Sequence, residues 1–249
     1  MKTTRSRLFT LLCILAMLIG LAAAAWAQSA PLEQPAQPEL DPETSFSDRL
    51  SSPIDFDAVD ESLLAAAIFL ATNQRRAEQD LAPLRHAPRL SRMAARHARR
   101  MVEQGFYAHD DPFERALARP VDRARAAGIA NPMVAENIHD YRALRSSGGA
   151  VYVLGGRGRF SLEPDGPAIP PHTYWSFAQS VVDEWMESSG HRHNILDPNA
   201  RQLGVGVRFY WRDGGWPFIK AVQNFQLFED VVGVKRLQAR VREGAGSAA

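Results

Sequence analysis

The most informative stretch of the chain covers residues 185–196 and reads Trp-Met-Glu-Ser-Ser-Gly-His-Arg-His-Asn-Ile-Leu. Apolar residues recur at helical spacing through the preceding segment, which predicts a helix that begins near Trp175. The Ser-Ser-Gly run at 188–190 is expected to break that helix before His191. The stretch therefore predicts a helix followed directly by a polar segment rich in histidine.

Other patches flank this stretch in a definite order. Phe-Tyr-Ala-His occupies 106–109 and Ala-Glu-Asn-Ile occupies 135–138, both before it. After it, glycines alternate with valines at 204–207, which predicts a strand that a helix or a neighbouring backbone approaches closely. The Asp-Gly-Gly run at 213–215 predicts a tight turn into a second strand over 217–228.

Taken together, these patches resemble the CAP superfamily, the cysteine-rich secretory proteins, and within it the bacterial secreted members with an SCP domain. One patch alone would be weak, but the set in this order is specific. The resemblance covers about residues 60–230. It implies an α/β fold, a three-layer α-β-α sandwich with a central, mostly antiparallel sheet and an open cleft on one side.

The family lines this cleft with two histidines and acidic residues. The positions that match here are His109, Glu136 and His191. The family's second cleft glutamate falls at Ser188, and Glu187 lies one residue earlier, on a different face of the helix. The resemblance therefore implies an incomplete set of cleft residues.

Three interpretations of these residues stay open. Two imidazoles and one carboxylate suit a divalent cation such as Zn²⁺, with a position left for water or a ligand. The same groups could divide acid and base roles in hydrolysis, although no nucleophile is indicated. Alternatively, Glu136 hydrogen-bonds both imidazoles and the backbone near Gly190, and so clamps the loops together without metal or catalysis. Elsewhere, His97 is expected in the core and His193 in solvent.

The N-terminus has the order of a secretory signal peptide. Lys2, Arg5 and Arg7 precede an apolar run over 8–25, and small residues stand before a cleavage point after Ala27. A retained anchor is the alternative, but no cluster of Lys and Arg follows the run. Residues 1–27 are therefore predicted to be removed on export.

The remainder of the chain divides by composition. A segment rich in Pro, Gln, Glu and Ser precedes the domain and is expected to be disordered, and a Gly- and Pro-rich insertion with one short β-like run interrupts the domain. The predicted organisation is signal peptide 1–27, disordered Pro-rich linker 28–59, CAP domain 60–230 with the insertion at 144–171, and flexible C-terminal tail 231–249.

Composition excludes several classes of function. The only cysteine, Cys13, lies in the predicted signal peptide, so the exported chain offers no disulfide, thiol nucleophile or thiolate metal site. The chain has 29 Lys and Arg against 28 Asp and Glu, and removal of three basic residues with the leader leaves a net charge of −2. A nucleic acid partner is not expected, because duplex binders concentrate basic charge.

Three functions fit these observations. The leading hypothesis is a secreted or periplasmic binding module, whose cleft at His109, Glu136 and His191 holds a divalent cation and which engages a cell-envelope or extracellular protein, glycan or lipid. The competing hypothesis is a secreted metal-dependent hydrolase, a peptidase or cell-wall enzyme. The third is a protein that binds a lipid or sterol near the insertion. The fold alone decides among none of them.

Overall fold

The structure is a computed structural model that describes residues 45–146, 151–155 and 157–227. The predicted signal peptide, residues 28–44 of the predicted linker and the predicted tail lie outside the described residues. Within the described ranges, no helix combines the length and the apolar character needed to span a bilayer. The elements in chain order are α2 (Phe46–Ser51), α3 (Glu61–Ala77), β1 (Arg85–His86), α4 (Pro88–Glu103), η1 (Arg115–Leu117), α5 (Pro120–Ala126), β2 (Val134–Arg142), β3 (Tyr152–Val153), β4 (Phe160–Ser161), α6 (Tyr174–Glu187), α7 (Ser189–Leu196), β5 (Gln202–Arg212) and β6 (Trp216–Gln226).

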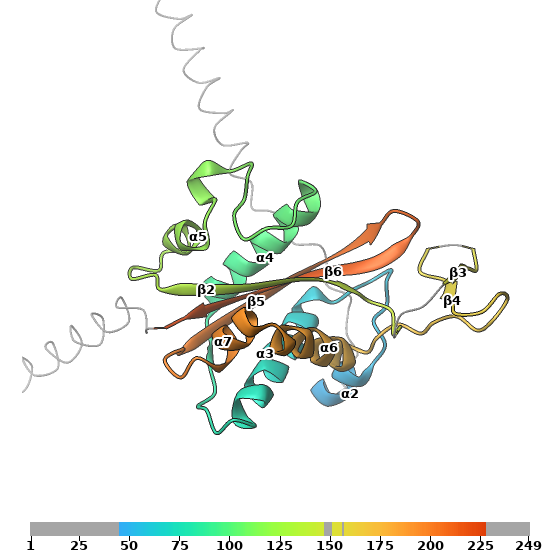
Figure 1. Ribbon diagram of the computed structural model, residues 1–249, viewed down its shortest axis with the longest axis horizontal. Coiled ribbons are helices and arrows are strands. Elements are labelled where there is room, and N and C mark those ends of the chain that lie inside the picture. The colour runs from blue at the N-terminus through green and yellow to red at the C-terminus, as the bar shows by residue number, and fades with distance from the viewer. Residues whose placement is uncertain (1–44, 147–150, 156, 228–249) are drawn as a thin grey trace, which may run out of the picture. The chain divides into compact units, whose positions relative to one another are not determined.

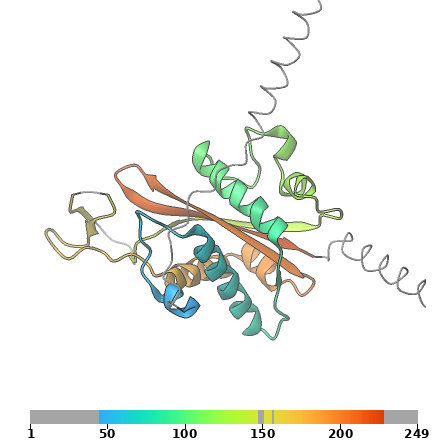
Figure 2. The ribbon, with the colours of Figure 1, turned by 180° about the vertical axis from the view of Figure 1, so that it is seen from behind.

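A four-stranded sheet in the order β1-β5-β6-β2 forms the middle layer. β1 runs parallel to β5, whereas β5–β6 and β6–β2 are antiparallel. In Figure 1 the strands run between α4 and α5 on one side and α3, α6 and α7 on the other. Figure 2 shows the same sheet from behind, with α4 in front of the strands. The predicted three-layer α-β-α sandwich with a mostly antiparallel sheet is confirmed.

The larger core lies between the sheet and the α3–α6 layer. Ile68 of α3, Phe177 and Trp185 of α6 and Phe225 of β6 are all buried there. Buried side chains recur every three or four residues along both helices, which is why each helix presents one apolar face to the sheet. Asp60 caps α3 by accepting hydrogen bonds from the amides of Ser62 and Leu63, as its position before the apolar run predicts.

Helix α4 covers the opposite face of the sheet at close range. A Cβ atom on Gly204 would overlap the backbone at Leu90, and one on Gly206 would overlap the backbone at Ala95. The predicted close approach at these glycines is therefore confirmed, and the neighbour is α4. The tight contact between α4 and β5 fixes the position of α4 against the sheet.

The part of the predicted linker that the structure describes is ordered, so the prediction of a disordered segment up to residue 59 is wrong for residues 45–59. Residues 46–51 form α2, and Ile54 is buried in the main core. The amide of Ile54 donates to the carbonyl of His172 at 2.8 Å. Leu50, Phe56 and Val59 also pack against this core, and the amide of Tyr174 donates to the carbonyl of Ser52. Contacts with α6 and the sheet therefore hold the segment on the domain, although its composition alone predicts disorder.

The predicted insertion contains a two-stranded hairpin, β3–β4, of which the sequence signalled only the first strand. Phe160 of β4 is fully buried, and its ring stacks on Trp216 with 3.6 Å between centroids. Leu144 and Ile169 complete this small apolar cluster. The insertion is therefore anchored to the turn end of the β5–β6 hairpin, which lies far from it in sequence.

Candidate functional site

Glu136 is the centre of the site and lies on β2, the edge strand of the sheet. Its side chain is 1% exposed. Both of its carboxylate oxygens accept from Nη2 of Arg123, at 2.8 and 3.0 Å, and Oε1 also lies 3.1 Å from Nδ1 of His109. A buried carboxylate needs such charged and hydrogen-bonding partners, because desolvation of an unpaired charge is costly.

Arg123 comes from α5, a helix that starts with Pro120 at its first position. The side chain of Arg123 is 5% exposed. Besides Glu136, Nη2 donates to the carbonyl of His109 at 3.0 Å, and Nη1 donates to the carbonyl of Ala118. One guanidinium therefore joins α5, the edge strand and the loop that carries His109. Sequence analysis did not single out this arginine.

His109 presents a half-exposed imidazole, with 49% of its side chain accessible. The hydrogen bond that Nδ1 of His109 donates to Glu136 raises the pKa of His109 above its usual value, partly opposed by burial. Because Nδ1 faces the carboxylate, the neutral ring carries its proton on Nδ1. Nε2 then has a free lone pair, on the side of the half-exposed ring away from Glu136. The structure thus brings His109 and Glu136, two of the three residues that match the family's cleft positions, into direct contact.

His97 lies behind this pair, on the inner face of α4. It is 1% exposed, its Nε2 lies 3.0 Å from the carbonyl of Ala108, and Glu136 is 3.9 Å away. Burial lowers the pKa of His97. The prediction that His97 is a core histidine is confirmed.

His191 lies in α7, and a buried asparagine ties that helix to the edge strand. The side-chain amide of Asn137 donates to the carbonyl of His191 at 3.2 Å, and Asn194 donates to the side-chain oxygen of Asn137 at 2.9 Å. The amide of Asn137 also donates to Gln223 at 3.1 Å. Sequence analysis did not name Asn137 as a site residue, although it stands in one of the quoted patches.

Of the contacts in the clamp interpretation, the described residues show the one between Glu136 and His109, whereas the tie to the backbone at His191 is made by Asn137, from the other face of the strand. Successive residues of a strand point to opposite faces, so Glu136 faces α4 and α5 while Asn137 faces α7.

The helix break is smaller than predicted: α6 ends at Glu187 and α7 begins at Ser189, so His191 is helical.

The pKa values of His109 and His191 are shifted in opposite directions. Burial, and then the charge of His109, lower the pKa of His191, whereas the pKa of His109 is raised. His139, two residues along β2 from Asn137, also has a lowered pKa, from burial and then in part from His191. The site therefore combines an accessible imidazole that takes up a proton more readily than usual with a second one that takes it up less readily.

Glu136 does not fit the role of a direct metal ligand. Its two oxygens already accept from Arg123 and His109, and a cation placed there would lie against a guanidinium. In the described part of the chain, no three His, Cys, Asp or Glu side chains meet closely enough to hold a metal ion. The imidazoles of His109 and His191 are the remaining candidate ligands, and Glu136 orients the first of them.

Ser188, at the position of the family's second glutamate, serves as the junction between α6 and α7. Its extended backbone ends the first helix, and its carbonyl accepts from the amide of Arg192 at 2.8 Å. Glu187 is exposed. Glu136 is therefore the buried carboxylate of the site, and Ser188 contributes through its backbone at the junction of the two helices.

Comparison with families of known sequence supports the family resemblance. The model of the cysteine-rich secretory protein family matches residues 69–225. The uncharacterized protein YkwD of Bacillus subtilis is 28% identical over 135 residues, which cover 54% of this chain and 38% of that protein. The chain thus spans well under half the length of this relative.

Two solved structures are also similar to this chain. An extracellular protein with an SCP domain from Bacillus anthracis is 22% identical, with a TM-score of 0.46, over 71% of this chain and 45% of that one. An outer surface protein of Borrelia burgdorferi is 12% identical, with a TM-score of 0.43, over 68% of this chain and 96% of that one.

Proposed function

Because this chain belongs to the cysteine-rich secretory protein family, we propose that it is an exported binding module whose recognition site is the cleft at His109 and His191. The basic and apolar order of residues 1–27 supports export. The observation that carries the proposal is the buried Arg123–Glu136 pair, which holds His109 by Nδ1 and leaves its other nitrogen on the accessible side of the ring. Its partner is a protein, glycan or lipid of the cell envelope or the exterior.

We further propose that the cleft takes a divalent cation through its two imidazoles. His191 suits this role because its lowered pKa keeps it in the neutral, ligating form. His109 must lose its proton first, and its raised pKa makes cation binding weaken as the pH falls. Glu136 fixes the ring of His109, as carboxylates commonly do behind metal-bound histidines. A bound cation would leave open positions for a ligand from the partner.

A hydrolase is the second candidate, and the carboxylate–imidazole pair is the observation that favours it. His109, oriented by Glu136, is placed as a general base for a water molecule. Among the described residues, however, no Ser or Thr hydroxyl hydrogen-bonds to His109 or His191, so an activated side-chain nucleophile has no support. Binding is therefore the better-supported function.

Zinc calorimetry on the purified protein tests the proposal. We expect one site of micromolar or tighter affinity, lost in His109→Ala and in His191→Ala. Glu136→Gln should weaken binding by about 10- to 100-fold without abolishing it. His193→Ala is the matched control, because His193 is an exposed histidine of the same helix, α7, and should bind as the unaltered protein does.

No zinc binding by the unaltered protein would refute the cation site. Complete loss in Glu136→Gln would show that the carboxylate is itself a ligand. Turnover of peptide or cell-wall substrates that disappears in His109→Ala and His191→Ala, and persists in His193→Ala, would replace the binding module with the hydrolase.

A further inference from the structure

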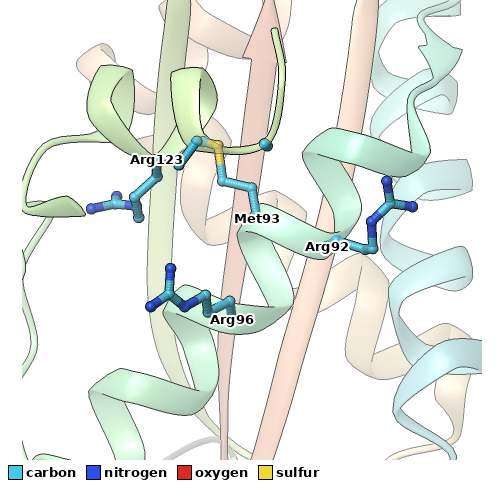
Figure 3. A pocket seen from close by; sticks show the side chains of 6 residues that line it. Arg92, Met93, Arg96 and Arg123 are labelled. Carbon is cyan, nitrogen blue, oxygen red and sulfur yellow. The ribbon is translucent and has the colours of Figure 1, made fainter. Parts of the chain in front are cut away.

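A small pocket opens between α4 and α5, behind the cleft described above. Its walls come from two turns of α4 and one turn of α5 (Figure 3), and it encloses about 190 Å³. That volume is below the range of about 300–1,000 Å³ typical of sites for drug-sized ligands. The lining residues are Arg92, Met93, Arg96, Arg123, Ala126 and Ala127.

One hydrogen-bond donor in this pocket is left unmatched. Arg123 uses Nη1 and Nη2 on Ala118, His109 and Glu136, but its buried Nε finds no acceptor among the residues that the structure describes. Buried polar groups are nearly always paired, so this N–H is open to an acceptor that is not part of the chain. The buried Nε atoms of Arg49, Arg142 and Arg208 are also unpaired, and Arg123 differs from them in lining the pocket. The side chain of Arg123 is 5% exposed, which makes this donor part of a built site.

The surroundings of this donor are strongly cationic. Nη2 of Arg96 donates to both oxygens of Glu114, and its other nitrogens make no hydrogen bond within the described ranges. Arg92 is exposed and forms no ion pair with a described residue. Residues 88–128 contain nine arginines against five acidic residues. In Figure 3 the guanidinium groups of Arg96 and Arg123 lie on the same side of Met93, and that of Arg92 lies on the other.

We propose that this α4–α5 pocket binds a compact oxyanion, a phosphate or carboxylate group, which accepts from Nε of Arg123 and from Arg96. Arg92 adds positive charge at the rim, and Met93, Ala126 and Ala127 give the occupant an apolar wall. Planar guanidinium groups suit both anions, because they donate parallel hydrogen bonds to two oxygens. The site is separate from the histidine cleft, yet it shares with it the guanidinium that holds Glu136.

The test is a titration of the purified protein with sodium phosphate and, separately, with sodium acetate, at an ionic strength held constant with sodium chloride. The Nε–Hε signals of arginine are followed by ¹⁵N NMR, and the melting temperature is measured in parallel. We expect one slowly exchanging Nε–Hε signal to shift saturably and the melting temperature to rise with the same apparent affinity. A response to phosphate alone assigns a phosphate group, and a response to both assigns oxyanions in general.

Variants on the surface make the result specific. Arg96→Gln should weaken binding by about tenfold or more, since a charge-assisted hydrogen bond is lost, and Ala126→Glu should abolish it by placing a carboxylate in the pocket. Arg99→Gln is the control, because it removes the same charge from α4 without lining the pocket. No saturable response, or equal affinity in all three variants, would overturn the proposal and leave ordered water as the partner of Nε.

Two sources of phosphate are separated by sedimentation with vesicles of phosphatidylglycerol and of phosphatidylcholine. Binding to the anionic vesicles alone, lost in Ala126→Glu and kept in Arg99→Gln, assigns the oxyanion to a lipid headgroup. Saturable phosphate binding without vesicle binding assigns it to a soluble anion. Either result is independent of whether zinc binds at His109 and His191.

Discussion

Replacing Arg123 by methionine tests the electrostatic centre of the site most directly. The change keeps an apolar chain of similar length but leaves Glu136 as a buried carboxylate that has lost two charged hydrogen bonds. Breaking a buried ion pair from one side costs about 3–5 kcal/mol. The carbonyls of Ala118 and His109 lose a donor as well. We therefore expect the free energy of unfolding to fall by about 3–5 kcal/mol.

A double-mutant cycle separates this cost from ordinary loss of packing. Glu136→Leu alone strands the guanidinium and should also be strongly destabilising, whereas Arg123→Met with Glu136→Leu removes both charges. The double variant should therefore be more stable than either single one, which gives a large coupling energy. Urea unfolding monitored by tryptophan fluorescence measures all three, since the chain has five tryptophans.

Arg119→Met is the matched control, because Arg119, which directly precedes α5, makes a two-point ion pair with Asp122 in the first turn of that helix but is 62% exposed. Its loss should cost less than about 1 kcal/mol. The reasoning is refuted if Arg123→Met costs no more than the control, or if the double variant loses the sum of the two single effects.

Three further predictions follow from the same contacts. Because the pKa of His109 is raised in the folded protein, its pair with Glu136 stabilises the fold fully below the unfolded pKa of about 6.5, and this stabilisation is lost as the pH rises through the folded pKa. NMR titration of the imidazole should show the raised pKa, and a pKa that stays the same in Glu136→Gln would contradict the prediction. Asn137→Ala should lower the free energy of unfolding by about 2–4 kcal/mol, because it leaves buried hydrogen-bond partners unpaired. Hydrogen exchange should show faster exchange of the amides of α7, and unchanged protection of α7 would contradict the role of Asn137 in holding that helix. Gly206→Ala should destabilise the domain by about 1–3 kcal/mol or more, because the methyl group meets the backbone of α4 at Ala95; denaturant unfolding with no loss of stability would show that α4 moves aside freely.

Sequence reasoning was most successful where the signal is local. The helical periodicity before Trp185 and the glycine alternation at 204–207 each depend on neighbours within a few positions, and each was found as predicted. The turn at 213–215 also forms, with Gly214 and Gly215 both at positive φ, a backbone conformation that glycine adopts without steric cost. These features come from short-range sterics and burial, which a sequence displays directly.

The errors came from contacts between distant segments. Composition predicted disorder before residue 60, yet Ile54 finds a place in the core beside α6. The insertion contains a strand that the sequence did not signal, because Phe160 is stabilised by stacking on Trp216, 56 positions later. Propensity in such segments is weak, so the tertiary partner decides whether they become ordered.

For the site, the sequence by itself picked out the patches that carry His109, Glu136 and His191, and the order of the patches indicated the family and the layers of the fold. Only the tertiary structure decided what surrounds Glu136. Arg123 looks like one more arginine on an amphipathic helix, and only the packing of α5 against β2 turns it inward. A helical pattern specifies which face of a helix is apolar, but a long cationic side chain at the border of that face can reach either solvent or a buried carboxylate. The choice depends on where the carboxylate lies in space, and that position is set by strand pairing between residues almost ninety positions apart.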